Sequence, residues 1–286
     1  MEVLDFTIYY EPGEVFHLSN FSDVHEDAEQ HDTEDFEAAL VRRSKLGNPL
    51  FYFNGDTMNL IWHRDEKRYV ASETASTLIT RDDFVNGVLN RCITRLAPYA
   101  PYILGVGMGN HEFEFTKRHG VDPVALLVRE LNNRNSPARW GGYSGYLRLK
   151  FCNKTAKYPG KSPVIYSQLY HHGKWLGQTL GKMGFERWAN SFECWDLATC
   201  GHIHETAAWE STRLRPGRVS GIKARTVYFL ETGCYLRAYS KSGNLPDYAE
   251  KNAMLPKFIG SPLIRLTPPS DNNAPIKIEL ILGKEV

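Results

Sequence analysis

The sequence has few cysteines and no long apolar run. Its 286 residues include five cysteines, none of them in a C-x-x-C pair, which argues against a disulfide framework and against a cysteine-based zinc site. We expect these cysteines to be reduced core residues. The chain begins with an acidic stretch rather than a basic segment followed by an apolar run, and no later stretch approaches the length of a membrane span. We therefore expect a cytoplasmic protein without a membrane partner.

Neither sign of charge predominates. Lysine and arginine number 34 and aspartate and glutamate 33, for a formal net charge of +1. Such a chain has no overall field that attracts nucleic acid or an anionic membrane, so a partner of that kind would need a local patch. The hydrophobic fraction of 42% and the charged fraction of 23% are typical of a globular protein with a large core. We expect one domain over residues 1–286, and the sequence leaves the oligomeric state open.

Strand-like and helical segments alternate along the first half of the chain. Residues 14–23, 49–54 and 102–109 read as strands, each followed by a polar turn. Helices are expected from Asp32 or Thr33 to about residue 46 and over much of residues 70–98, where apolar residues recur at spacings of three and four. This alternation predicts a parallel or mixed sheet with helices packed on its faces.

The second half is richer in strand-like segments. Strands are expected at 144–151, 163–170 and 196–200, with a helix over about 181–195. Three more strand-like runs lie at 225–239, 261–268 and 276–282, separated by glycine and proline. We expect the C-terminal strands, from about residue 225 to 286, to complete a second sheet.

Five turns that follow strand-like segments contain side chains able to bind metal ions. They hold Asp23 and His25 (SDVH), Asp56 (NGD), Asn110 and His111 (GNHE), His171 and His172 (YHHG), and His202 and His204 (GHIH). In open α/β sheets the carboxyl ends of the strands face one crevice, so residues far apart in sequence can converge there. A set of carboxylate, imidazole and amide ligands without cysteine suits manganese, iron or zinc. The ligands are too many for one ion.

The ordered set D-x-H, G-D, G-N-H-E, H and G-H-x-H, which spans residues 23 to 204, resembles the calcineurin-like metallophosphoesterase superfamily. The tract HHGKWLGQTLGK is also similar to glycine-rich loops in uncharacterised members encoded by bacteriophages. The resemblance implies an α/β fold in which two packed mixed β-sheets are flanked by helices, a four-layer sandwich. It also implies a metal-dependent hydrolase of phosphodiesters or phosphomonoesters, in which a hydroxide that bridges two divalent ions attacks phosphorus. Manganese is the favoured metal, with iron, zinc or nickel as alternatives.

Carried over by position, the resemblance implies a role for each motif residue. Asp23, His25 and His204 would bind one metal; Asn110, His202 and one of the pair His171 and His172 would bind the other; Asp56 would bridge the two. His111 would act on the leaving-group oxygen rather than bind metal. Both members of the histidine pair fit the motif, and we favour His171 over His172.

The substrate is less well defined by the sequence. A phosphate-ester substrate is expected, which includes a nucleotide or nucleic acid, and one alternative is a nuclease acting on DNA or RNA ends. A second alternative is a non-catalytic interaction protein that retains the fold. Basic residues gather in one segment, Arg148, Lys150, Lys154, Lys157 and Lys161. We expect this segment to be a solvated hairpin tip roughly 25 Å from the metals, since eight strand residues separate them. After Asp56, a run with Asn59, Trp62, His63, Arg64 and Arg68 either contacts substrate or starts an ordinary helix.

Overall fold

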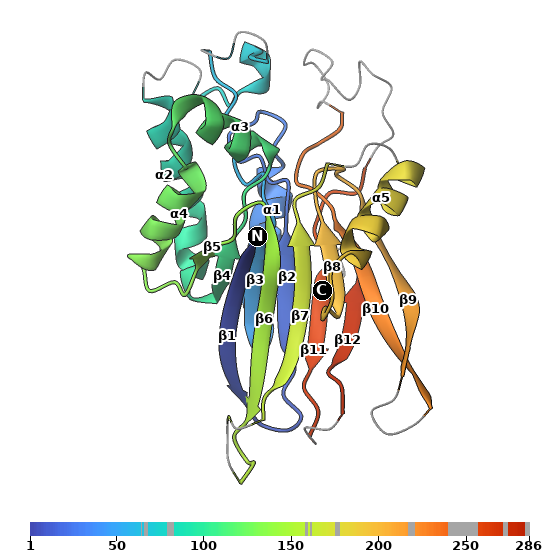
Figure 1. Ribbon diagram of the computed structural model, residues 1–286. Helices are drawn as coiled ribbons and strands as arrows, with labels where there is room; N and C mark the ends of the chain where they lie inside the picture. Colours follow the sequence, from blue (N-terminus) through green and yellow to red (C-terminus); the bar gives the residue numbers. More distant parts are fainter. Residues whose placement is uncertain are drawn as a thin grey trace.

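Two six-stranded sheets form the framework of the protein. In the computed structural model, residues 1–63, 65, 68–78, 83–157, 160, 162–174, 178–216, 221–239, 257–270 and 274–283 are described. Within these residues the strand orders are β1-β6-β7-β8-β10-β9 in the first sheet, sheet A, and β12-β11-β2-β3-β4-β5 in the second, sheet B. The strands run along the length of the molecule, and most of the loops and short helices gather at one end of them (Figure 1).

Sheet B contains the strands predicted from the first half of the chain. Its members are β2 (Phe16–Phe21), β3 (Pro49–Phe53), β4 (Ile103–Val106), β5 (Arg139–Trp140), β11 (Leu263–Thr267) and β12 (Lys277–Ile281). The neighbours β2, β3, β4 and β5 are parallel, whereas β11 is antiparallel to β2 and to β12. Because β2, β3 and β4 are parallel, their carboxyl ends lie at one edge of the sheet.

Sheet A is built mainly from the second half of the chain. It comprises β1 (Glu2–Tyr10), β6 (Ser144–Asn153), β7 (Val164–His171), β8 (Leu197–Cys200), β9 (Thr206–Pro216) and β10 (Ile222–Thr232). The pairs β7–β8 and β8–β10 are parallel, and β6–β7 and β9–β10 are antiparallel. The carboxyl ends of β7 and β8 therefore also lie together.

Helices cover the outer face of each sheet. The helices are α1 (Thr33–Ser44), α2 (Phe84–Leu96), α3 (Asn110–His119), α4 (Pro123–Asn132) and α5 (Gln178–Asn190), with 3-10 turns η1 (Ala71–Glu73) and η2 (Ala97–Tyr102). In Figure 1, α2 and α4 lie on one side of the molecule and α5 on the opposite side, near β8 and β10. None of the described helices is long and apolar enough to cross a membrane.

The helices on sheet B, sheet B, sheet A and the helix on sheet A form four layers. Three apolar layers of side chains lie between them. One packs α1, α2 and α4 on sheet B, around Phe36, Phe53 and Val88. The second joins the two sheets, and the third packs α5 on sheet A through Phe185 and Phe229. Burial of aromatic and branched side chains in all three layers stabilises the stack, at about 25 cal/mol per Å² of apolar surface. The prediction of two mixed sheets flanked by helices is confirmed.

The described C-terminal strands are divided between the two sheets. β10 joins sheet A, whereas β11 pairs with β2 in sheet B and β12 pairs with β11; we had expected the strands from about residue 225 onward to complete one second sheet. The edge strands β1 and β9 were not predicted. β1 pairs in parallel with β6, whose residues lie more than one hundred positions later in the chain. A local sequence pattern does not indicate a partner so distant in sequence.

The predicted helices are found with different extents. Asp32 caps α1 by accepting a hydrogen bond from the Asp35 amide, as its sequence position suggested. Within the described residues of the region 70–98, helix is found over η1 and α2 and at the start of η2. Four of the five cysteines are buried and Cys194 is exposed.

Candidate metal centre

The five motif turns converge where the carboxyl ends of parallel strands meet. Asp23 and His25 follow β2, Asp56 follows β3, and Asn110 and His111 follow β4, all from sheet B. His172 follows β7, and His202 and His204 follow β8, from sheet A. The backbone ties the turns together, because the Asp23 amide donates to Gly55 and the His25 amide donates to Asp56. Both sheets thus supply side chains to one site.

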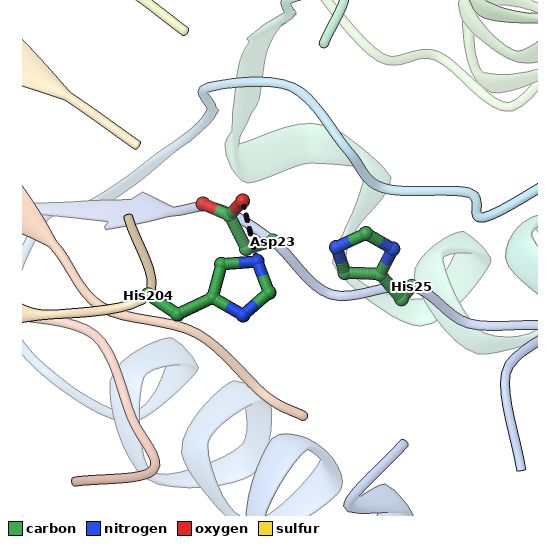
Figure 2. Close-up of side chains that lie close together, drawn as sticks. All are labelled: Asp23, His25 and His204. Carbon is green, nitrogen blue, oxygen red and sulfur yellow. Dashed lines mark ion pairs between the residues drawn. The ribbon is translucent and has the colours of Figure 1, made fainter. Parts of the chain in front are cut away.

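Three overlapping groups of side chains lie close enough to hold metal ions. Their members are Asp23, His25 and His204; His25, Asp56 and His111; and Asp56, His172 and His202, and within each group the ligand atoms are within 4.8 Å of one another. Figure 2 shows the first group, with the His204 ring beside the Asp23 carboxylate at 3.2 Å. His25 and Asp56 each belong to two of the groups, and the Asp56 carboxylate lies 3.8 Å from Nε2 of His25 and 3.1 Å from Nε2 of His172.

Asn110 lies with the third group. Its side-chain oxygen is 3.1 Å from Nε2 of His172, which is also 3.1 Å from the Asp56 carboxylate. His172 is fully buried, and its Nδ1 lies 2.9 Å from the Asn54 carbonyl oxygen. That carbonyl can only accept, so Nδ1 carries the hydrogen and Nε2 faces Asp56 and Asn110.

His171, which we favoured over His172 from the sequence, lies outside these groups, whereas His172 belongs to one of them. His171 is the last residue of β7, and it shares a face of the strand with Leu169, which packs under α5. Its ring contacts Trp188 of α5, with centroids 4.8 Å apart, and its Nδ1 accepts a hydrogen bond from Gly173. Alternation along the strand turns His171 toward α5, while the next residue enters the cluster.

His111 lies at the start of α3 beside His25. The two rings are 4.8 Å apart at nearly a right angle. Nδ1 of His111 is 2.7 Å from the Asn59 carbonyl oxygen, and the His111 amide donates to the Asp56 carboxylate at 3.0 Å. The helix N-terminus thereby helps to hold a negative charge at Asp56.

Electrostatics within the cluster keep the carboxylates ionised. Burial opposes ionisation of Asp23, but His204 and His172 lower its pKa to about 2. Burial likewise opposes the charged form of His204, yet Asp23 raises its pKa to about 10. For His25, burial and the neighbouring His111 lower the pKa to about 3, so its ring is neutral and can donate a lone pair.

Several of these residues have an unusual backbone conformation. Asp23, His25, Asp56, His202 and His204 have φ angles of 51°, 49°, 48°, 71° and 54°. Side-chain-bearing residues rarely adopt this left-handed region, and they do so mainly where surrounding structure compensates. Among the glycines that precede these residues, Gly55 has a φ of 91°. At Gly109 and Gly201 the requirement is close approach, because a Cβ there would collide with Asp56 and with Ser22.

Glu112 connects the turn after β3 with the turn after β4. Its buried carboxylate accepts hydrogen bonds from the amides of Gly109, Asp56 and Met58, at 2.9, 3.1 and 2.9 Å. Burial and the neighbouring Asp56 raise the pKa of Glu112 to about 8. Glu112 lies in the first turn of α3, and its contacts join the turn after β3 to the turn after β4.

A helix start was one of the two alternatives for the run after Asp56, and its described residues contain no helix. Trp62 is only 8% exposed and stacks on Phe84 inside the core, so it is not available to stack on a base. Arg68 pairs with Asp65, and Arg64 lies outside the described residues. Asn59, by contrast, contacts both His25 and His111. Asp27, which contacts the Asn59 amide, was missed, although it continues the alternation that begins at Asp23 and His25.

The basic segment lies at the far end of the β6–β7 hairpin. Ser144 pairs with His171 at the end nearest the cluster, and Phe151 pairs with Val164 at the other. Arg148 and Lys150 both pair with Asp5 of β1, which neutralises part of their charge. Lys161 lies outside the described residues.

Comparisons with known proteins give matches in structure only. No family model matches the sequence, and no curated protein matches it. Among solved structures, a metallophosphoesterase from Sphaerobacter thermophilus is similar at 10% identity and a TM-score of 0.39, covering 95% of this chain and 90% of that one. GAP50, the anchor in the inner membrane complex of Plasmodium, is similar at 9% identity and a TM-score of 0.46, covering 95% and 85%.

Proposed function

We propose that this chain is a metal-dependent phosphoesterase that hydrolyses phosphodiesters or phosphomonoesters at the cluster of strand-end turns. The observation that supports this most is the convergence of carboxylate and imidazole side chains from five turns into three groups with ligand atoms within 4.8 Å. The Asp56 carboxylate lies 3.8 Å from Nε2 of His25 and 3.1 Å from Nε2 of His172, as a residue shared between two cations would.

The donor set fits two divalent ions. Asp23, His25 and His204 would hold one, Asn110, His172 and His202 the other, and Asp56 would contact both. Nε2 of His25 is buried and has no hydrogen-bond partner among the described residues, as expected for a ligand atom. Oxygen and nitrogen donors of this kind suit manganese, iron, zinc or nickel, and manganese is our first choice. Such ions, when bound, activate water and offset charge on phosphoryl oxygens.

The remaining steps belong to the side chains of the protein. Asn59 fixes the hydrogen of His111 on Nδ1, so Nε2 is the atom free to face a substrate. When protonated, Nε2 would donate to the oxygen of the departing group. Asp56 is held in place by the His111 amide, so the acid and the shared ligand are oriented together.

A nuclease is the less favoured version of this proposal. The two sequence features that suggested nucleic acid were Trp62 and the basic segment. Trp62 is packed in the core, and the basic segment begins with residues paired to Asp5 at the far end of its hairpin. A small phosphate ester needs neither feature.

The test is hydrolysis by metal-stripped protein after addition of Mn²⁺, Zn²⁺, Fe²⁺, Ni²⁺ or Mg²⁺. Bis(p-nitrophenyl) phosphate reports diesterase activity and p-nitrophenyl phosphate reports monoesterase activity. The variants Asp56→Ala and His172→Ala should lose activity and bound metal, whereas the matched control His171→Ala, which alters the adjacent histidine, should keep both.

Two results would contradict the proposal in different ways. If the protein binds no metal, the cluster is not a metal centre and a non-catalytic interaction role becomes the better interpretation. If it binds two ions per chain yet hydrolyses neither ester nor single-stranded DNA ends, the phosphoesterase assignment fails while the metal centre stands.

A further inference from the structure

Two histidines of the cluster are oriented by the same residue. Nδ1 of His25 lies 3.2 Å from the side-chain oxygen of Asn59, and Nδ1 of His111 lies 2.7 Å from the main-chain oxygen of Asn59. Both oxygens accept hydrogen bonds, so each ring carries its hydrogen on Nδ1. In both histidines Nε2 is therefore the atom that can act in the cluster.

Asn59 is itself held by a buried carboxylate. The amides of Asn59 and Leu60 donate to the two oxygens of Asp27, at 2.6 and 2.9 Å. Asp27 has no exposed surface, so water cannot replace it as the acceptor.

The turn that Asp27 holds is strained. Leu60 has a φ of 55°, a conformation that a leucine avoids when it is free to relax. Its side chain is 2% exposed and packs in the core layer under sheet B. Without the Asp27 carboxylate, the amides of Asn59 and Leu60 would be buried without acceptors. The backbone around residues 59 and 60 would then be expected to leave its strained conformation.

We propose that Asp27 is a positioning residue for both His25 and His111, and that it acts through the turn at Asn59. This inference rests on the proposed function for its catalytic consequences. Two atoms of Asn59 contact different histidines: its side-chain oxygen orients a metal ligand, and its main-chain oxygen orients the acid. Asp27 governs both because it holds the backbone from which both atoms extend.

Because the two oxygens of Asn59 contact different histidines, substitutions at Asn59 and at Asp27 should have different effects. Asn59→Ala removes the contact to His25 but keeps the carbonyl that holds His111. It should weaken Mn²⁺ binding by about tenfold or more, while the His111 ring keeps its Nδ1–H tautomer. Asp27→Asn keeps the size of the side chain but turns an amide group toward one of the two backbone donors. It should lower kcat by about tenfold or more at saturating Mn²⁺, with little change in KM.

The experiment measures kcat, KM and Mn²⁺ affinity for the full chain with bis(p-nitrophenyl) phosphate. Asp65→Asn is the matched control, because Asp65 is also buried but pairs with Arg68 and Arg118. Long-range ¹H–¹⁵N NMR of the histidine rings gives a readout independent of activity, with His25→Ala and His111→Ala identifying the signals. In Asp27→Asn the His111 ring should lose its single Nδ1–H tautomer; in Asp65→Asn it should keep it.

The possible results separate this inference from the proposed function. Parent protein without metal-dependent turnover would refute the phosphoesterase assignment, and the NMR comparison would still decide whether Asp27 orients the rings. Active parent protein with an Asp27→Asn variant of unchanged kcat and unchanged tautomer would overturn the role of Asp27. Equal losses in Asp27→Asn and Asp65→Asn would show a general effect of removing a buried carboxylate, and would overturn it as well.

Discussion

At the scale of single residues, Asn110 and His111 are neighbours in the chain with different expected roles. Asn110 lies against His172, whereas His111 lies against His25 and Asn59. We expect His111→Ala to keep its bound metal but to lose activity by about 10²- to 10⁴-fold, the usual contribution of a general acid. Asn110→Ala should instead lose metal from the protein. Measured metal content together with kcat separates the two roles, and equal metal loss in both variants would make His111 a ligand.

Glu112 allows a second prediction at this scale. It accepts three backbone hydrogen bonds from the turns that carry Asp56 and Asn110. Glu112→Gln presents an amide N–H group to one of these donors, and a buried donor left without an acceptor costs about 1–3 kcal/mol. Urea unfolding at pH 9, above the pKa of Glu112 of about 8, should show a loss of that size. Glu114→Gln is the control on the same helix, since Glu114 is partly exposed and pairs only loosely with Arg118. A loss of stability equal to that of the control would show that the three backbone hydrogen bonds to Glu112 do not stabilise the fold.

At the scale of elements, the pairing of β1 with β6 depends partly on a charge contact. Arg148 donates two hydrogen bonds to Asp5, and Lys150 donates a third. These contacts lower the pKa of Asp5 from 3.8 to about 2. Because the folded pKa is the lower one, the stabilisation is present above about pH 4 and is lost as the pH falls toward 2.

Asp5→Asn should therefore be less stable than the parent at pH 7, by at most about 1 kcal/mol because the three side chains are about one-third exposed. The difference should shrink as the pH is lowered from 4 to 3. Urea unfolding of both proteins at pH 3, 4 and 7 measures this. Glu11→Gln, which alters a more exposed pair with Lys154, should show no such pH dependence. A constant difference across the range would mean that packing rather than charge sets the effect.

The sequence predicted the strand ends better than it predicted strand partners. Asp23, Asp56 and His202 were identified because a polar turn after an apolar run is a local pattern. The partner of a strand is set by contacts between distant segments, so the division of β10 from β11 and β12 between the two sheets has no local signal in the sequence. The choice between His171 and His172 depended on where β7 ends, and a difference of one residue reverses the direction of a side chain. Asp27 carries no motif, and its contacts form only once residue 59 is folded beside it.

At the scale of the whole molecule, the proposed metal centre joins the two sheets. Asp23, Asp56 and Asn110 come from sheet B, and His172 and His202 from sheet A. An ion that binds such residues binds the folded chain and not the unfolded one, so it stabilises the whole stack. At a free concentration one hundred times its Kd, each ion adds about 2.7 kcal/mol. The sheets already share an apolar layer, so metal removal should lower the unfolding temperature without abolishing the fold.

We expect EDTA to lower the unfolding temperature of the parent and Mn²⁺ to restore it in one cooperative transition. Asp56→Ala should respond to neither, because it lacks a residue common to two of the ligand groups. His171→Ala should respond as the parent does. Two separate transitions after EDTA would show that the sheets unfold independently once the ions are gone, and the centre would then be the main link between them. An equal response in Asp56→Ala would locate the stabilising ion elsewhere, and the centre would have no part in joining the sheets.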